Sequence, residues 1–426
     1  MRWISATDLE SWAKSLNARE DLPKIVSDLI RASAPDIVSI RFPNGDKGQV
    51  RGFDGHLVSQ VEALNVPLGR SLWEFGTNEN YQGKSKGDFA KRTLEVEASL
   101  QRETTYVFVT PRTWDSSNKR NKVEDFIAAR KAESAWKEVV FIDGAALETW
   151  LEEHPAVSAW HARNTLCLVP ADGLRSTDEF WAEFAGCFRP PITEEVLLCD
   201  RSETAEWLMQ ELSKASNAAA LVADSPDEAI AFAIAAIHKA PPEVRLFFEA
   251  RTLVVDSSAA GRQLLPRGRL ILLLRNDAAK SPMQFSSIGT AFVPLGRQQR
   301  GINAPTLMRP TSHALDMAMC SMGLEQNHAI TLARGSGRSL AALARLIPGG
   351  SYEPPSWERN GSELLPAILA GAWDSSNRND CTIIEELADV ESCANLEGRI
   401  RAHFIDVDPP FDLEGSIWKV RGIHPA

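Results

Sequence analysis

Two acidic residues in the N-terminal part of the chain, Asp54 and Glu74, have the type and spacing that a metal-dependent phosphodiesterase uses. Each stands at the end of a short apolar and aromatic run, and a lysine-rich stretch follows them. Carboxylate oxygens are the ligands that Mg²⁺ prefers, and a nearby lysine offsets the charge of an attacked phosphate. Their separation of 20 residues predicts two neighbouring strands that bring both carboxylates to one edge of a sheet.

Each acid also has a purely structural interpretation. Asp54 precedes Gly55, and Gly76 closely follows Glu74, so both acids could end a strand and begin a turn. Asp-Gly is a common turn dipeptide, and Asp54 alone is explained equally well by a turn. The pairing of two acids with following lysines favours the metal-binding interpretation.

The elements that must position these acids follow from apolar periodicity over the first 165 residues. Helices are expected where apolar residues recur with helical spacing, and strands where β-branched and aromatic residues gather. The expected helices are one capped by Thr7 or Asp8, then Asp21–Ala32, Val123–Ala135 and Gly144–Glu153. The expected strands are Ile37–Phe42, Gln49–Phe53, Ser71–Phe75, Tyr106–Thr110 and Glu138–Asp143. This arrangement predicts an α+β domain with a mixed sheet.

The rest of the chain changes in pattern twice. After a linker at 166–200, strands and helices alternate over 201–350, which predicts a parallel, helix-flanked sheet followed by helices. Residues 351–426 predict two or three helices and a hairpin, with strands at Ile400–Phe404 and Ser416–Val420, as in a winged helix. We therefore expect an α/β multidomain protein with domains at 1–165, 201–350 and 351–426.

Composition limits the classes of protein to which this chain can belong. The 426 residues are 44% hydrophobic and 24% charged, as in ordinary globular proteins, and the net charge of −11 gives no overall attraction to nucleic acid. The six cysteines include no CxxC pair, which favours neither a zinc site nor a disulfide framework and fits a reducing cytoplasm. No apolar run reaches about 18 residues, so we expect no membrane span.

The N-terminal segment resembles the PD-(D/E)XK restriction-endonuclease-like superfamily, and in particular the nuclease-like domains of bacterial anti-phage NTPases. The resemblance covers roughly Ile4 to Asn164. The residues that carry it are Leu22-Pro23, Gly52-Phe53-Asp54-Gly55, Ser71-Leu72-Trp73-Glu74, Lys91-Arg92-Thr93 and Phe108–Trp114. It implies a cytoplasmic DNA endonuclease of an anti-phage defence system, with Mg²⁺ or Mn²⁺ held by Asp54 and Glu74.

One position departs from the pattern of that superfamily. Its members have a lysine two residues after the second acid, where this chain has Gly76. The resemblance therefore implies a lysine that has moved to the next helix, Lys84 or Lys86, with Lys91 as the next choice. It also implies a local basic track for the DNA backbone. That track comprises Lys84, Lys86, Lys91, Arg92, Arg112, Lys119, Arg120 and Lys122.

The middle region resembles the P-loop modules of signal-transduction ATPases with numerous domains, but it lacks the chemistry of a phosphate loop. Such a loop needs glycines, a lysine and a hydroxyl, whereas Val222–Ala229 contains neither glycine nor lysine. Asp227 and Glu228 would present negative charge to phosphates. We therefore expect no ATP hydrolysis. The string Gly335–Ser339 is glycine-rich, but it lies between helices and is as well explained by a turn with a cap at Ser336 or Ser339.

Two functions of different classes remain open from the sequence. The first is a metal-dependent nuclease effector that contacts DNA and associates with itself or with other defence subunits. The second is a catalytically inactive scaffold in which both sites have decayed. A transcription regulator is disfavoured because Ile383–Ala388, which would contact DNA in the C-terminal module, is acidic.

Overall fold

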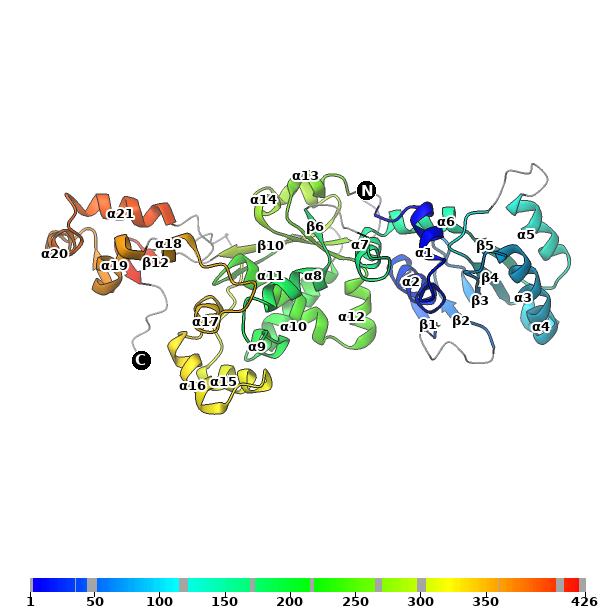
Figure 1. Ribbon diagram of the computed structural model, residues 1–426, viewed down its shortest axis with the longest axis horizontal. Helices are drawn as coiled ribbons and strands as arrows, with labels where there is room; N and C mark the ends of the chain where they lie inside the picture. The colour runs from blue at the N-terminus through cyan, green and yellow to red at the C-terminus, as the bar shows by residue number, and fades with distance from the viewer. Residues whose placement is uncertain are drawn as a thin grey trace. The chain divides into compact units, whose positions relative to one another are not determined.

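The structure is a computed structural model that describes residues 3–34, 36–43, 52–114, 122–168, 173–214, 218–264, 270–296, 304–359, 361–403 and 410–420 (Figure 1). The chain divides into two compact units, each built from separate stretches. The first unit comprises Met1–Ser176, Pro241–Leu272 and Ser287–Gly289. The second comprises Thr177–Ala240, Leu273–Ser286 and Thr290–Ala426. Among the described residues, no helix is both long enough and apolar enough to cross a bilayer.

A five-stranded mixed sheet lies at the centre of the N-terminal segment, as the sequence predicts. Its strands follow chain order: β1 (Ile37–Arg41), β2 (Gly55–Ser59), β3 (Gly69–Phe75), β4 (Thr104–Val109) and β5 (Glu138–Ile142). The pairs β1–β2 and β2–β3 are antiparallel, whereas β3–β4 and β4–β5 are parallel. Thr104–Val109 is buried throughout, as expected for a strand that is covered on both faces.

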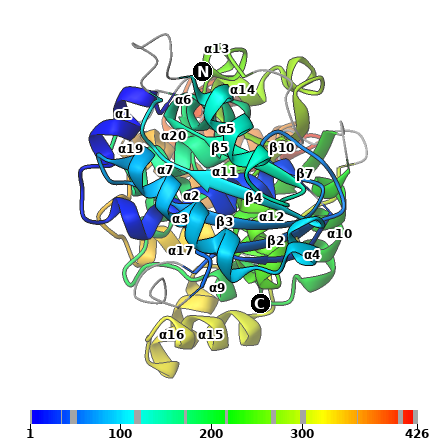
Figure 2. The same cartoon turned by 90° about the vertical axis from the view of Figure 1, so that its right-hand side faces the viewer.

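Helices cover both faces of this sheet. They are α1 (Ala6–Trp12), α2 (Ala18–Ser33), α3 (Tyr81–Glu95), α4 (Ala98–Gln101), α5 (Val123–Ala132), α6 (Gly144–Glu153) and α7 (Pro155–Asn164). Helices α3 and α5 lie on one side, and α1, α2 and α6 lie on the other (Figure 1). Figure 2 looks onto the side of α3 and α5. Beneath these two helices is a largely aromatic cluster: Leu72, Tyr81, Phe89, Tyr106, Phe108, Trp114, Trp136, Val139 and Phe141.

Two details of the N-terminal segment differ from the prediction. The cap of α1 is Ser5 and not Thr7 or Asp8: the Ser5 hydroxyl accepts the backbone N–H of Asp8, whose carboxylate accepts from the Ser5 backbone. This reciprocal pair is a capping box, which satisfies two backbone donors at once. The expected strand Gln49–Phe53 falls largely outside the described residues, and β2 begins only at Gly55. Asp54 therefore directly precedes a strand.

A second five-stranded sheet contains β6 (Leu174–Arg175), β7 (Ala218–Ala223), β8 (Thr252–Val255), β9 (Leu270–Leu274) and β10 (Gly289–Gly296), in the order β6-β8-β9-β10-β7. Strands β10 and β7 are parallel, as predicted, and the short edge strand β6 is antiparallel to β8. The associated helices are α8 (Thr177–Ala185), α9 (Glu194–Leu198), α10 (Ser202–Ser213), α11 (Pro226–Lys239), α12 (Pro242–Glu249), α13 (Ser258–Gly261), α14 (Asn276–Ala279) and a 3₁₀ helix at Pro282–Phe285.

Helix α11 is the most deeply buried helix of the second unit among those described. Every residue from Glu228 to Ile237 is buried, because its small and branched apolar side chains surround the whole helix. Helices α15 (Ser312–Ser321), α16 (Gln326–Gly335) and α17 (Leu340–Leu346) follow the sheet. The helical continuation after Pro310 is thus as predicted.

The C-terminal module contains α18 (Ser356–Arg359), α19 (Gly361–Ala370), α20 (Arg378–Ala388), α21 (Cys393–Ala402), β11 (Ala372–Asp374), β12 (Phe411–Glu414) and β13 (Ile417–Val420). Its antiparallel sheet has the order β11-β13-β12. The predicted strand at Ile400–Phe404 is wrong, because Ile400 is a buried residue of α21. The indole rings of Trp373 and Trp418 stack with centroids 5.7 Å apart in the core of this module.

Candidate functional site

The pairing of β2 with β3 brings Asp54 and Glu74 together. Gly55 is paired with Trp73 in this antiparallel ladder, so the next position along places Asp54 opposite Glu74. The Asp54 carboxylate also accepts the backbone N–H of Phe75 at 3.0 Å, which fixes it against β3. Directly opposed residues on antiparallel strands are side-chain neighbours. Asp54 therefore lies opposite Glu74, directly before the first residue of β2.

Glu74 is buried, with 2% of its surface exposed. Burial raises the pKa of Glu74 to about 8, and the negative charge of Asp54 adds to this increase. Arg92 acts in the opposite direction but does not reverse the shift. The charge of Asp54 disfavours ionisation of Glu74, and a cation bound between the two acids would relieve this repulsion.

Arg92 belongs to this acidic site and not to a surface track for DNA. Its Nε donates to Glu74 Oε1 at 2.5 Å, and its Nη1 donates to Glu95 Oε2 at 2.7 Å. Its Nη2 donates to the backbone carbonyl of Gly52. The residue is 8% exposed, so its guanidinium is committed to internal partners. The expectation that Arg92 contacts the DNA backbone is therefore corrected.

The structure separates the two preferred lysine candidates. Lys84 lies on the face of α3 that meets the acidic site: a Cβ atom built on Gly76 would be 3.3 Å from Lys84 Cδ. The stem of Lys84 thus passes next to the position where the superfamily has its lysine. Its Nζ pairs with Asp88 Oδ2 at 2.5 Å. Lys86, two residues further along α3, is exposed.

A stripe along α3 completes the cluster. Lys84, Asp88 and Arg92 are spaced by four residues, so one face of the helix presents them in line. The sequence prediction missed Asp88, although this spacing could have revealed it.

The sequence prediction also missed Tyr106, whose buried hydroxyl has no hydrogen-bond partner in the described part of the chain. Burial raises the pKa of Tyr106, and Glu74 is the next cause.

Three other residues of the expected DNA track, Lys91, Arg112 and Lys122, lie within the described residues. Lys91 is exposed, with its Nζ 3.9 Å from Glu95 Oε1. Arg112 Nε donates to the Thr77 carbonyl at 2.8 Å, and Lys122 is exposed just before α5. The remaining two predicted contacts, Lys119 and Arg120, fall outside the described residues.

The acid pair fits a hard divalent cation in its donor chemistry. Mg²⁺ is commonly held by one or two carboxylates, with water completing the shell. Asp54 and Glu74 supply two carboxylates, and the described residues bring no third carboxylate, histidine or cysteine close enough to form a three-ligand group with them. Arg92 already occupies one oxygen of Glu74, so a metal ion would share that carboxylate with the guanidinium or displace it.

A second cluster lies where a phosphate loop is expected, between the end of β7 and the start of α11. The connection is only two residues long, Asp224 and Ser225, and the Ser225 hydroxyl caps the helix by accepting the N–H of Glu228 at 3.1 Å. Glycines and a lysine, which would cradle phosphates, are absent from these described residues.

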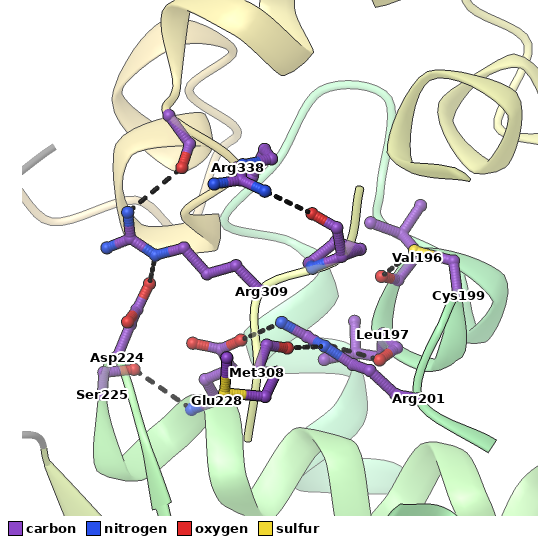
Figure 3. Close-up of polar contacts among 12 residues, drawn as sticks. Val196, Leu197, Cys199, Arg201, Asp224, Ser225, Glu228, Met308, Arg309 and Arg338 are labelled. Atoms are coloured by element: carbon purple, nitrogen blue, oxygen red, sulfur yellow. Dashed lines mark hydrogen bonds and ion pairs between the residues drawn. The ribbon is translucent and has the colours of Figure 1, made fainter. Parts of the chain in front are cut away.

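Three acids at the N-terminal end of α11 each form an ion pair with an arginine. Arg309 Nε donates to Asp224 Oδ2 at 2.7 Å, and Arg201 Nη2 donates to Glu228 Oε1 at 3.2 Å (Figure 3). Arg275 donates two hydrogen bonds of 2.8 Å to the Asp227 carboxylate. The N-terminal end of α11 is thus occupied by internal ion pairs that a phosphate group would have to displace.

The arginines also connect this cluster to neighbouring segments. Arg309 Nη1 donates to the Gly337 carbonyl at 3.1 Å, and Arg338 Nη1 donates to the Pro310 carbonyl at 3.4 Å (Figure 3). Gly337 and Arg338 have positive φ values, +55° and +64°, in the turn between α16 and α17. The glycine-rich string is therefore a turn that Ser339 joins to α17 as its N-cap residue.

Comparisons of the chain with protein families, with curated proteins and with solved structures found no match. The family resemblances drawn from the sequence remain predictions.

Proposed function

We propose that the N-terminal domain is a Mg²⁺- or Mn²⁺-dependent deoxyribonuclease that acts in the cytoplasm as an effector of bacterial anti-phage defence. The observation that carries this proposal is the opposition of Asp54 and Glu74 across β2 and β3, with Lys84 beside Gly76. These three groups supply the carboxylates and the cation that phosphodiester hydrolysis requires.

Asp54 and Glu74 would hold the metal ion, which would act as a Lewis acid and activate a water molecule. The Lys84 ammonium would offset the negative charge of the scissile phosphate. Asp88 restrains that ammonium through their 2.5 Å ion pair. Arg92 fixes the orientation of Glu74, and its positive charge opposes the rise in the Glu74 pKa.

DNA would be held by positive side chains outside the acid pair. Lys86, Lys91 and Lys122 are exposed and can contact phosphate oxygens without leaving a buried partner. Because the chain carries a net charge of −11, this attraction would be local and would weaken steeply with salt. Association with itself or with other defence subunits would place several such domains on one DNA.

One observation favours the second candidate function, an inactive scaffold. Arg92 and Glu74 form a buried ion pair, with side chains 10% and 3% exposed. Such a pair is costly to break, because one charge is left buried without its partner. If the Arg92 guanidinium stays paired with Glu74, the acids stabilise the fold and bind no metal ion. The domain would then act only through contacts of its surface with other proteins.

Plasmid cleavage by the full chain separates the two functions. We expect supercoiled plasmid to be nicked or linearised with Mg²⁺ or Mn²⁺ and to remain intact with EDTA. Glu74→Gln and Asp54→Asn should each reduce the rate about 100-fold or more, because a metal ligand is lost. Glu79→Gln is the matched control, since Glu79 is an exposed acid five residues beyond Glu74. Cleavage that persists unchanged in Glu74→Gln would exclude this site, and a folded wild type that never cuts supports the scaffold.

A further inference from the structure

A pocket of about 780 Å³ opens beside the N-terminal end of α11, in the second unit. Its walls come from α8, the start of α11, α17 and the segment 351–355. Pockets that bind small molecules span roughly 300–1,000 Å³. The pocket therefore has the size of a small-molecule site, in a unit for which the nuclease proposal assigns no ligand.

One wall of the pocket is aromatic. Phe180 and Phe184 from α8 stack with ring centroids 6.1 Å apart and an angle of 14° between their planes. Phe188 continues the row, with its ring 5.8 Å from that of Phe184. Tyr352 also lines the pocket. Aromatic faces of this kind attract flat rings and cations.

The charged groups in the lining favour a cation over an anion. Four carboxylates and two guanidinium groups contribute to it: Glu183, Asp227, Glu228, Glu353, Arg275 and Arg345. Arg275 pairs with Asp227, and its Nη2 lies 3.5 Å from Glu183 Oε1, so the charge of Arg275 is already balanced within the wall. The Glu228 carboxylate is buried, and its Oε2 has no hydrogen-bond partner in the described residues. Arg201 pairs with Glu228 from outside the lining, so the four carboxylates exceed the three guanidinium groups by one charge, and a phosphate group would meet net negative charge.

We propose that this pocket binds a small planar aromatic ligand that carries a cationic nitrogen donor, and that it does not bind phosphate-bearing nucleotides. The ring would lie against Phe184, and the cation would compete with Arg275 for the carboxylates of Glu183 and Asp227. Charge-assisted hydrogen bonds and cation–π contacts would then act together. This inference is independent of the nuclease site.

Calorimetric titration of the full chain with benzamidine tests the proposal, because this probe joins a flat ring to a planar cation. Benzoate has the same ring with the opposite charge, and magnesium pyrophosphate represents the nucleotide phosphates. We expect saturable binding of one benzamidine with a Kd of about 1 mM or tighter. Benzoate and pyrophosphate should bind at least about tenfold more weakly.

Two variants and one control make the test specific. Asp227→Asn frees Arg275 from its main partner, so benzamidine should bind about tenfold more weakly and benzoate more tightly. Phe184→Ala should weaken benzamidine about threefold or more by removing a ring. Glu206 is an exposed acid of α10, and Glu206→Gln should change neither the benzamidine affinity nor the benzoate affinity.

Three results would overturn the proposal. They are no saturable benzamidine binding up to about 10 mM, tighter binding of pyrophosphate than of benzamidine, and an unchanged benzamidine affinity in Asp227→Asn. If Asp227→Asn does not fold, Glu183→Gln takes its place, since Glu183 lines the same wall and should also weaken benzamidine. An unchanged affinity in Glu183→Gln would then count against the proposal.

Discussion

Replacing Arg201 by methionine should destabilise the second unit strongly. Arg201 and Glu228 form a buried ion pair whose side chains are 2% and 4% exposed. Arg201 also donates to the Met308 carbonyl at 2.7 Å and to the Leu197 carbonyl at 3.1 Å. Methionine keeps most of the apolar stem and removes all of these donors, so the change isolates the polar contribution.

The loss of unfolding free energy in Arg201→Met follows from the buried groups that lose their partner. A buried carboxylate that loses its cation costs about 3–5 kcal/mol, and the two carbonyls that lose a charged donor add to this cost. Burial already raises the pKa of Glu228, so proton uptake limits the penalty. We expect a loss of about 4–6 kcal/mol for Arg201→Met. Glu228→Gln keeps an oxygen that accepts from Arg201, and the guanidinium keeps both of its carbonyl acceptors, so this change should cost less, about 1–2 kcal/mol.

Amide hydrogen exchange in α11 measures these losses locally, which suits a chain with more than one unit. The double variant Arg201→Met/Glu228→Gln should lose at least about 2 kcal/mol less than the sum of the single losses, because the unpaired carboxylate is gone. A loss in Glu228→Gln equal to that in Arg201→Met would refute this reasoning. So would strict additivity of the two changes.

Three further perturbations have defined outcomes. Burial, followed by the charge of Arg251, lowers the pKa of His154 from 6.5 to about 4, so its stabilising contribution is complete above pH 6.5 and is lost as the pH falls towards 4. The free energy of unfolding of the first unit should fall by on the order of 3 kcal/mol over this pH range. His154→Gln should remove this dependence on pH. Arg309→Met removes the ion pair with Asp224 and the bond to the Gly337 carbonyl, so exchange should accelerate in α17 and remain unchanged in α2. Gly76→Ala places a Cβ 2.6 Å from Phe108 Cζ in a packed core, so thermal or urea unfolding should show a loss of about 1–3 kcal/mol.

The elements that the sequence predicts well are those with a strong periodic or compositional signal. Leu22, Ile25, Val26 and Leu29 repeat with helical spacing and are fully buried in α2. The apolar run Leu270–Leu274 is a fully buried strand. Such patterns predict elements well because only a few backbone conformations bury the apolar side chains and also pair the backbone polar groups. The expected position of Asp54 rested on a strand at Gln49–Phe53, whereas Asp54 directly precedes β2.

The parts that failed depend on tertiary contacts. Ile400 has the β-branched character of a strand residue, but it fills the helical side of a core built around Trp373 and Trp418. Propensity is a weak prior when packing decides the outcome. The family resemblance implied that Arg92 belongs to a basic track for the DNA backbone, but the residue is buried. Its partner Glu74 lies 18 residues earlier, and only the folding of α3 onto the sheet brings the two together.

Titration of Mn²⁺, followed by electron paramagnetic resonance, tests the central claim that Asp54 and Glu74 form a divalent-metal site. The measurement needs neither DNA nor an activating signal. We predict one bound ion in the wild type and in Glu79→Gln, with affinity reduced about tenfold or more in Asp54→Asn and in Glu74→Gln. Equal Mn²⁺ affinity in all four proteins, or no bound ion in the folded wild type, would contradict the account.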